Sequence, residues 1–568
     1  MSAAASIITD AETAKAHGVH YTPESLADFL ADRILAALHG ETAPAVLDPA
    51  CGDGELLDAF ARALPAAHLT GVDRDSDALV GAKERLARDG IKAFTPLHAD
   101  FLEINPLAEA EHGLEADSFD AIISNPPYVR TQVLGAEKAQ ELAERFNLSG
   151  RVDLYQAFVH AMTPCLRPGG VLGLLCSNRF LTTLAGMALR EFLADEYELV
   201  EIFDLGDTKL FAAAVLPAIV IARRKKGGEA NDACSYVRVY EAPTIESAPA
   251  ADSVIAALAD GAEGAVEVDG RVYEIERGTV KMGATAKDPW TLTHDDRAGW
   301  LEQIEAKTDK TFDEVAKIRV GIKTTADAVF IRRKWSDLPA DQQPESDLIH
   351  PLITHHIAER WTTPEGSKLA RTVLYPHEVG STGKRANVAL DQFPNAERYL
   401  EANRERLEGR TYVIEAGREW YEVWVAHQPA DWPKRKIVFP DISELPKFFL
   451  DESGAIVNGD CYWMAFDDDA EPELLSLMLA VANSSFAVAF YDAVCGNRLY
   501  AGRRRFITQY VKRFPIPDVD ETTRTRIHTL VEKLRATEAG SDERTAFEAK
   551  LDTLVWAAFG LRVGQASV

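Results

Sequence analysis

The feature that most constrains this chain is a short apolar run that ends in two consecutive prolines. Residues 119–123 (Phe-Asp-Ala-Ile-Ile) have the composition of a buried parallel strand, and Ser-Asn-Pro-Pro-Tyr follows at 124–128. Because proline cannot donate to a sheet or continue a helix interior, the chain must leave the sheet at Asn125 in a rigid, extended turn. The turn lies at the carboxyl end of a strand, where open α/β sheets bind their ligands.

This turn presents an amide, a proline carbonyl and an aromatic ring, which together suit an exocyclic amino group. Such a group needs two acceptors for its two N–H bonds and a flat surface for its ring. The catalytic candidates are therefore the side-chain oxygen of Asn125, the carbonyl of Pro126 and the ring of Tyr128. Asn-Pro turns also end strands that have no function, so the residues that precede this turn must decide between the two interpretations.

A second strand end lies at residues 45–54, which read Ala-Val-Leu-Asp-Pro-Ala-Cys-Gly-Asp-Gly and precede a predicted helix. Gly52 and Gly54 would let a ligand approach the backbone closely, and the free N–H groups of a helix start favour an anionic group. Asp48 would repel a pyrophosphate, and the spacing differs from GxGxxG. An acid beside a glycine turn instead suits a ligand that carries both a cationic amino group and a carboxylate.

Two further predicted strands also end in acidic residues. Residues 68–73 end in Asp73, about twenty residues after the glycine turn, and a carboxylate there can hydrogen-bond ribose hydroxyls. Asp100 and Phe101 follow the next extended segment and supply an acceptor for an adenine amino group and a ring to pack on the base. Each feature alone is compatible with an ordinary turn, but four suitable strand ends in succession favour a ligand site.

The first half of the chain alternates between strand and helix patterns. Thr22 and Pro23 open one helix, and a segment that begins near residue 150 opens another. Apolar runs over residues 170–177, 199–204 and 216–222 indicate further strands. This alternation predicts an α/β fold with a doubly wound, mostly parallel sheet.

The ordered set of motifs from Tyr21 to about Arg224 resembles the class I S-adenosylmethionine-dependent methyltransferases, and within them the N6-adenine DNA methyltransferases of the TaqI type. The resemblance implies S-adenosylmethionine as cofactor, with its ribose held by Asp73, a shorter acid than the family's frequent glutamate. It also implies the other cofactor-binding residues, which are Tyr21, Thr22, Asp48, Ala50, Gly52, Gly54, Asp100 and Phe101. Phe211 matches the family aromatic that stacks on the target base opposite Tyr128, although a phenylalanine before an apolar strand is often a core residue.

Composition limits the classes of protein that this chain can represent. A chain of 568 residues is too long for one core, and 46% hydrophobic and 26% charged residues are usual for a soluble protein. We find no apolar run long enough to span a bilayer and no signal-peptide pattern. The six cysteines are scattered without a CxxC pair, so neither a zinc site nor a disulfide framework is expected. We therefore expect a cytoplasmic protein that needs no metal and no membrane.

The second half of the chain is expected to recognise double-stranded DNA. The net charge of −28 argues against a nucleic-acid partner, but a local basic cleft can coexist with an acidic surface. A glycine-led segment at residues 320–331 resembles the opening of the family's C-terminal specificity domain. Basic and aromatic residues interleave further on, and the candidate DNA-binding residues are Lys434, Arg435, Arg498, Arg503, Arg504 and Arg505. Basic runs also occur on faces that are merely solvated.

These features divide the chain into four predicted segments. The first is a cofactor-binding catalytic domain (1–240), followed by a connecting segment (241–287). An α+β target-recognition domain (288–520) and a C-terminal helical segment (521–568) complete the chain.

The expected reaction is methyl transfer to N6 of an adenine flipped out of double-stranded DNA, as in the modification enzyme of a restriction-modification or phage-defence system. Asn125 and Pro126 would accept both N6 hydrogens and concentrate the nitrogen lone pair toward the methyl donor. Tyr128 and Phe211 would offset the cost of unstacking the base. A separate partner restriction endonuclease is compatible with the sequence.

Three alternatives stay open. Enzymes that methylate a glutamine side chain in translation factors use the same Asn-Pro-Pro-Tyr turn, and so do some RNA methyltransferases, because amide and adenine amino groups pose the same chemical problem. The long second half favours DNA over both. A non-catalytic DNA-specificity component is the third alternative, which the intact Asn125 and Tyr128 disfavour.

Overall fold

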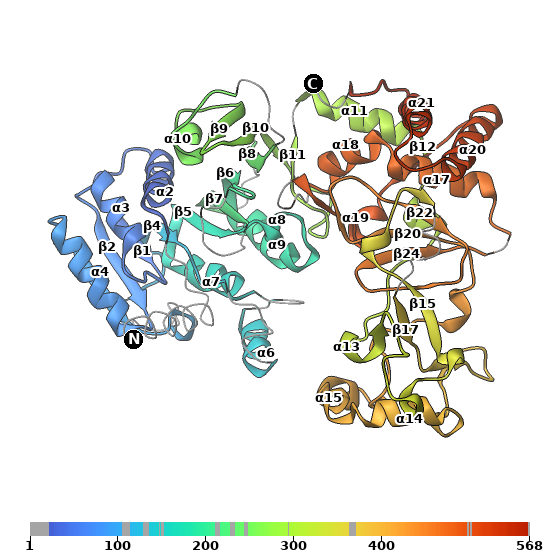
Figure 1. Cartoon of the computed structure of the whole chain (residues 1–568). Helices are drawn as coiled ribbons and strands as arrows, with labels where there is room; N and C mark the ends of the chain where they lie inside the picture. The colour runs from blue at the N-terminus through green and yellow to red at the C-terminus, as the bar shows by residue number, and fades with distance from the viewer. Residues whose placement is uncertain are drawn as a thin grey trace. The chain divides into compact units, whose positions relative to one another are not determined.

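The computed structural model of this chain separates it into two units (Figure 1). The first unit comprises Met1–His294 and Ala493–Gly502, and the second comprises Asp295–Asp492 and Arg503–Val568. The structure describes residues 22–104, 114–128, 136–146, 148, 153–208, 210, 216–227, 233–242, 248–293, 295–362, 371–467, 469–496, 499 and 502–565. Three of the predicted site residues, Tyr21, Phe211 and Arg498, lie outside the described residues.

The sheet of the first unit has a parallel core in the order β3-β2-β1-β4-β5. Beyond β5 the order continues β7-β6-β8, and β7 runs antiparallel to both of its neighbours. These strands are β1 (Ala45–Asp48), β2 (His68–Asp73), β3 (Phe94–His98), β4 (Phe119–Ser124), β5 (Leu166–Ser177), β6 (Tyr197–Asp204), β7 (Pro217–Arg224) and β8 (Ser235–Glu241). The predicted α/β fold with a mostly parallel sheet is confirmed.

Helices cover both faces of this sheet. They are α2 (Glu24–Ala37), α3 (Glu55–Ala63), α4 (Ser76–Arg88), α6 (Ala136–Arg145), α7 (Leu154–Met162), α8 (Arg179–Thr182), α9 (Met187–Glu196) and α10 (Val254–Ala259). Successive residues of a strand point to opposite faces, so Ile122 of β4 packs in one core cluster while Ala121 and Ile123 pack in the other. The first cluster includes α7 and α9, and the second includes α2 and α3, which makes the sheet doubly wound.

The register of the parallel strands brings their carboxyl ends to one edge of the sheet. Asp48, the last residue of β1, is paired with Gly71 of β2. Asp73, the last residue of β2, is paired with His98 at the end of β3. Because β4 is parallel to β1 and ends at Ser124, the Asn-Pro-Pro turn leaves the sheet at the same edge. The acidic strand ends and this turn therefore form one site.

The sheet continues past the boundary predicted at residue 240. Strands β9 (Gly264–Val268), β10 (Arg271–Lys281) and β11 (Thr291–Thr293) complete an 11-stranded sheet, in which β10 pairs antiparallel with β8 along its length. Residues 241–287, expected as a connecting segment, therefore contribute strands to the first unit.

The second unit is an α+β arrangement of small sheets and helices. Its five-stranded sheet consists of β13 (Ile318–Val320), β24 (Cys461–Ala465), β20 (Lys436–Pro440), β22 (Phe449–Asp451) and β16 (Trp361–Thr362). Its four-stranded sheet consists of β14 (Ile331–Arg332), β17 (Thr372–Leu374), β15 (Ile349–Ile353) and β23 (Ile456–Val457). The two-stranded pairs are β12 (Thr308–Thr311) with β26 (Pro515–Pro517), β18 (His377–Val379) with β19 (Arg385–Asn387), and β21 (Ile442–Ser443) with β25 (Arg504–Arg505).

Helices of the second unit include the closing segment of the chain. They are α11 (Asp295–Ala306), α12 (Phe312–Val315), α13 (Asp327–Phe330), α14 (Pro394–Glu401), α15 (Arg404–Glu408), α16 (Thr411–Glu415), α17 (Pro472–Asn483), α18 (Ser485–Val494), α19 (Thr508–Val511), α20 (Glu521–Ala536) and α21 (Asp542–Ala558). Both α20 and α21 contact α17. The C-terminal helical segment expected after residue 520 is therefore part of the second unit.

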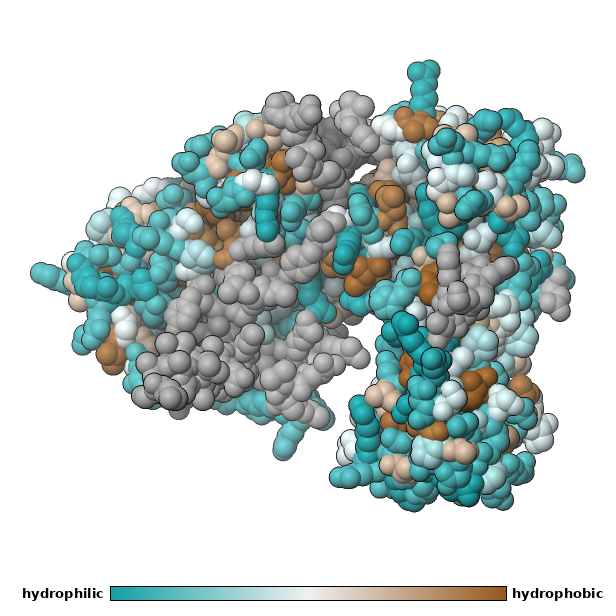
Figure 2. Space-filling model, in the orientation of Figure 1, coloured by the Kyte–Doolittle hydropathy of each residue, from teal (hydrophilic) through white to brown (hydrophobic). Residues whose placement is uncertain are grey.

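Hydrophilic residues predominate on the face shown in Figure 2, with small hydrophobic areas between them.

Among the described residues, no single helix is long and apolar enough to cross a membrane, and only α17 and α18 together, bent by 67°, reach that length and composition. The same residues contain no group of three or more potential metal ligands, and the six cysteines are buried free thiols.

Candidate functional site

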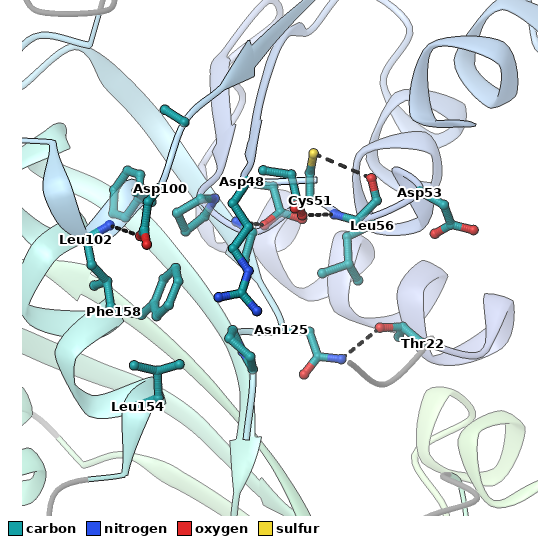
Figure 3. Close-up of a pocket in the computed structure, with 18 of the residues that line it drawn as sticks. Thr22, Asp48, Cys51, Asp53, Leu56, Asp100, Leu102, Asn125, Leu154 and Phe158 are labelled. Carbon is teal, nitrogen blue, oxygen red and sulfur yellow. Dashed lines mark hydrogen bonds between the residues drawn. The ribbon is translucent and has the colours of Figure 1, made fainter. Parts of the chain in front are cut away.

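A cavity of about 280 Å³ opens at the carboxyl edge of the parallel strands (Figure 3). Its lining comes from the segment before α2, the chain that follows β1, β2, β3 and β4, and the helices α3, α6 and α7. The predicted site residues that line it are Thr22, Asp48, Ala50, Gly52, Asp73, Asp100, Phe101 and Asn125. The structure therefore gathers in one cavity the side chains that the sequence places at four separate strand ends.

Asp73 ties the glycine turn to the end of β2. Its Oδ2 accepts a hydrogen bond of 2.9 Å from the backbone N–H of Gly52, and its Oδ1 accepts one of 2.9 Å from that of Asp75. Each carboxylate oxygen has a second lone pair, so both can still accept from a ligand hydroxyl. Asp73 thus holds the turn in place while it faces the cavity.

Asp48 is almost fully buried at the base of the cavity. Its Oδ1 accepts a hydrogen bond of 3.1 Å from the backbone N–H of Ala50. Burial raises the pKa of Asp48 to about 8, the Ala50 bond opposes the rise, and the nearby Asp73 charge adds to it. Without a ligand this carboxyl is therefore mainly protonated at neutral pH, and a cationic group in the cavity would favour its ionised form.

The two glycines of the turn have different roles. Gly52 lines the cavity with φ +52°, and a Cβ there would meet no atom within 4 Å, so the turn needs glycine for its backbone conformation. Gly54 does not line the cavity. It precedes α3 with φ +82°, and a Cβ would lie 2.9 Å from the Cβ of Ala82 in α4. Gly54 is therefore constrained by the packing of α3 against α4, and its implied cofactor contact stays an expectation.

The far end of the cavity is aromatic. Asp100 Oδ1 accepts from the N–H of Leu102 at 3.1 Å and faces the cavity. The rings of Phe101 and Phe158 are nearly parallel, with an interplanar angle of 12° and centroids 6.0 Å apart. Leu154 and Phe158, which the sequence did not single out as site residues, also line the cavity (Figure 3). Helical periodicity cannot separate core from cavity lining, because both require buried apolar side chains.

Two basic residues in the lining were missed by the sequence analysis. Arg74 directly follows Asp73, and Lys138 lies on α6, where its Nζ donates to Glu103 at 2.8 Å. The position of Arg74 next to a predicted ribose acid was the available signal. Lys138 had none, since α6 joins the site only through the fold.

The Asn125 side chain is the centre of a short hydrogen-bond chain. Its Nδ2 donates to Thr22 Oγ1 at 3.0 Å, and its Oδ1 accepts from the Tyr128 hydroxyl at 2.7 Å. Pro126 is buried, and the half-buried ring of Tyr128 packs edge-on against Tyr155 with centroids 6.4 Å apart. The catalytic candidates Asn125, Pro126 and Tyr128 thus lie together in one turn, and of the three Asn125 lines the cavity.

Most of the basic residues predicted to contact DNA are paired within the second unit. Arg504 donates two hydrogen bonds to Asp492, at 2.7 and 2.6 Å, and Arg505 donates two to Asp441, each of 3.0 Å. Arg503 is exposed, and its side chain has no hydrogen bond or ion pair to another residue that the structure describes. Arg503 therefore keeps the free charge that a phosphate contact requires.

The other predicted basic residues, Lys434 and Arg435, also form contacts within the protein. Lys434 forms an ion pair of 2.8 Å with Asp467, and Arg435 donates to the carbonyl of Ala470 at 2.9 Å. Trp432, two residues before Lys434, is buried. The sequence could not show these pairings, because the carboxylate and carbonyl partners lie more than thirty residues away along the chain.

Two family models match the chain. They are the Eco57I restriction-modification methylase over residues 66–211 and the TaqI-like C-terminal specificity domain over residues 382–516. The type II methyltransferase M.BanIII of Aneurinibacillus aneurinilyticus is 37% identical over 568 residues, which cover 96% of this chain and 97% of that protein. The chain belongs to the type II DNA methyltransferases of restriction-modification systems. Its first unit has the class I methyltransferase fold, and most of the specificity-domain match lies in the second.

More distant relatives share only part of these features. A release factor glutamine methyltransferase of Caulobacter vibrioides is 32% identical over 160 residues, which cover 26% of this chain and 51% of that protein. The solved structure described as a DrdV–DNA complex covers 92% of this chain and 57% of that chain, with a TM-score of 0.51 and 11% identity. At that identity the structural likeness of this methyltransferase to DrdV concerns the fold alone.

Proposed function

We propose that this methyltransferase transfers a methyl group from S-adenosylmethionine to N6 of an adenine that has been flipped out of double-stranded DNA. The observation that carries the proposal is the position of Asn125, whose amide lies beside a cavity lined by acids and aromatic rings. Membership in the type II DNA methyltransferases supports DNA as the substrate.

The residues of the cavity fit the proposed cofactor group by group. Asp73 can accept from the ribose hydroxyls, and Asp100 with Phe101 and Phe158 suits the adenine. Asp48, buried and poised near pKa 8, suits the cationic part of the methionine moiety. When bound, S-adenosylmethionine supplies an electrophilic methyl group on a sulfonium centre.

The chain contributes two acceptors for the target amino group. Asn125 Oδ1 and the Pro126 carbonyl would each accept one N6 hydrogen, which draws the nitrogen toward a tetrahedral shape and localises its lone pair. Oriented dipoles of this kind act without a general base, because they are fixed before the target arrives. This use of the turn requires no metal.

The target adenine must leave the duplex to reach the turn at the edge of the sheet. Unstacking a base costs a few kcal/mol, and stacking on an aromatic side chain offsets about 1–3 kcal/mol of that cost. We assign this stacking to Tyr128, with Phe211 proposed for the opposite face. Arg503 is our proposed phosphate contact in the specificity region.

The proposed biological role is the modification half of a restriction-modification system, with cytoplasmic DNA as substrate. A separate cognate endonuclease would cleave the same sequence when it lacks the methyl group.

The test is transfer from S-[methyl-³H]adenosylmethionine to equal amounts of duplex DNA, RNA or a translation release factor. We expect label in DNA, recovered as N6-methyladenine after digestion, and sequencing of the modified adenines would give the recognition sequence. Label only in the release factor would instead support glutamine methylation, for which the Caulobacter relative is the specific precedent. Label on cytosine would contradict the choice of base.

A further inference from the structure

The turn between α8 and α9 carries an exposed leucine at the carboxyl edge of the sheet. Helix α8 begins two residues after β5 ends at Ser177, and a single turn, Leu184–Gly186, leads from it into α9 (Figure 1). The Leu184 side chain is 54% exposed, and among the described residues of the first unit only Val80 is another large hydrophobic residue with such exposure. A single exposed apolar residue is common on protein surfaces, so its role depends on where it lies and how firmly it is held.

Buried Arg190 of α9 holds this turn in place. Its guanidinium donates to the carbonyls of Phe180 and Thr183 and to a third carbonyl in the segment before β11. Burial of a guanidinium is costly unless its donors are paired, so these bonds fix the backbone that they contact. A Cβ at Gly186 would overlap the backbone of Phe180, which shows that the turn packs directly on α8. Leu184 therefore projects from a rigid base.

Helix α7 connects this turn to the catalytic turn. Tyr155 of α7 packs edge-on against the ring of Tyr128, with centroids 6.4 Å apart. The next residue, Gln156, is buried, and its amide nitrogen donates to the carbonyl of Ala185 at 3.0 Å. Because β4 and β5 are parallel neighbours, the catalytic turn and α8 also leave the sheet at the same edge. Leu184 is thus held in a fixed position relative to the proposed site of the flipped base.

The charge beside this leucine suits a nucleic acid. Arg179 of α8 is exposed, and its side chain forms no hydrogen bond or ion pair with another residue that the structure describes. The hydroxyl of Thr183, the residue before Leu184, donates to the Arg179 carbonyl at 2.8 Å, so the cation and the leucine lie within one turn of each other. An unpaired cation next to an apolar side chain matches a phosphate next to a base step.

We propose that Leu184 is a positioning residue that enters the duplex beside the target adenine and fills the space that this base leaves. Apolar side chains, leucine among them, insert between base steps and unstack them. Extrusion of a base leaves a gap in the stack, and an apolar side chain in that gap stabilises the open duplex. Arg179 contacts the adjacent phosphate. This inference rests on the proposed function, because it assumes that a base leaves the duplex.

The first experiment measures base flipping directly. The target adenine of a duplex with the recognition sequence is replaced by 2-aminopurine, whose fluorescence rises when it leaves the stack, and S-adenosylhomocysteine is present. We expect Leu184→Ala to lower this signal and to slow single-turnover transfer to the adenine duplex about tenfold, with an unchanged melting temperature. Leu184→Met, which keeps an apolar side chain of similar size, should behave as the wild type. The matched control is Val80→Ala on α4, which should alter neither the signal nor the rate.

A mismatched duplex separates this role from a general effect on the fold. A mismatched adenine is easier to extrude than a paired one, so the wedge contributes less to its transfer. We expect the tenfold loss in Leu184→Ala to shrink to less than twofold when the target adenine is mismatched. An equal loss on paired and mismatched duplexes would overturn the inference, and so would a Leu184→Ala variant that flips and methylates the paired adenine as fast as the wild type.

The same samples distinguish failure of this inference from failure of the proposed function. If the wild type leaves adenine in DNA unlabelled in the transfer assay, the proposed function fails. If the wild type methylates adenine and the Leu184→Ala variant does so equally well, only the role of Leu184 fails.

Discussion

The Tyr128 hydroxyl donates a hydrogen bond of 2.7 Å to Asn125 Oδ1, the same oxygen that our mechanism assigns to an N6 hydrogen of the target. An amide oxygen has two lone pairs, so it can accept from both groups or exchange one for the other. The ring of Tyr128 and its hydroxyl therefore have separable roles. The ring is available for stacking on the base, and the hydroxyl orders the acceptor before the base arrives.

Replacement of Tyr128 by phenylalanine tests this separation. We expect Tyr128→Phe to keep single-turnover transfer within about threefold of the wild type, because one neutral hydrogen bond is lost while the ring remains. Tyr128→Ala removes the ring, and since base–aromatic stacking is worth about 1–3 kcal/mol, its transfer should fall by about tenfold or more. Equal losses in the two variants would contradict the stacking role.

The raised pKa of Asp48 predicts that cofactor binding depends on pH. Burial raises the pKa of Asp48 to about 8 in the ligand-free protein. Below that pH the carboxyl is mostly protonated, so it must release its proton when a cationic group binds. The affinity for S-adenosylhomocysteine should therefore increase by up to about tenfold per pH unit between pH 6 and 8 and level off above. Calorimetry in buffers of different ionisation enthalpy would show the released proton.

The matched control for this effect is Asp48→Asn, which keeps the size of the side chain and cannot ionise. We expect its affinity to be weaker at pH 8 and nearly constant from pH 6 to 8. The sign of the effect on folding is opposite. A folded-state pKa above the unfolded value costs stability as pH rises through this range, so the asparagine variant should lose less stability than the wild type toward pH 8.

Phe158 is predicted to hold the cofactor adenine together with Phe101. Phe158→Leu removes the parallel ring surface 6.0 Å from Phe101 but leaves an apolar side chain. Its affinity for S-adenosylhomocysteine should fall by between about threefold and tenfold, the worth of an aromatic pair. Phe312→Leu, in the core of the second unit against Phe514, is the control and should leave that affinity unchanged. If Phe158→Leu and Phe312→Leu bind S-adenosylhomocysteine with the same affinity, Phe158 has only a structural role.

Arg503 and Arg504 are adjacent in sequence, but substitution of Arg504 should affect stability and substitution of Arg503 should affect DNA binding. Arg504→Ala leaves Asp492 without two of its hydrogen bonds and should destabilise the protein by about 2 kcal/mol or more. Arg503→Ala should leave the melting temperature unchanged and weaken DNA binding, with the salt dependence of log K reduced by about 1. A variant of Arg503 with unaltered salt dependence would show that this residue meets no phosphate.

The sequence was sufficient to predict that the acids and the Asn-Pro-Pro turn lie at one edge of the sheet. Asp48, Asp73 and Asn125 each follow a run whose strand character is local, and parallel strands necessarily bring their carboxyl ends together. The predicted sheet and the gathering of these residues at one cavity followed from that rule alone.

The features that escaped prediction depend on contacts between distant parts of the chain. Gly54 is fixed by Ala82 of the next helix, and Phe158 is both a core residue and part of the cavity. Arg504 was predicted to contact DNA as part of an arginine run, but in the folded protein it donates to Asp492, twelve residues earlier in the chain. Side-chain type indicates which interactions are possible, and only the tertiary structure decides which of them form.

The most direct test of the account is the N6-methyladenine content of duplex DNA after incubation with the wild type and with Asn125→Ala, measured by mass spectrometry alongside S-adenosylhomocysteine affinity. The account predicts N6-methyladenine with the wild type and none with the variant, while both bind S-adenosylhomocysteine to within about threefold, because the amide acts on the target and contributes at most one weak bond elsewhere. Methylated adenine in DNA treated with Asn125→Ala at the wild-type rate would contradict it.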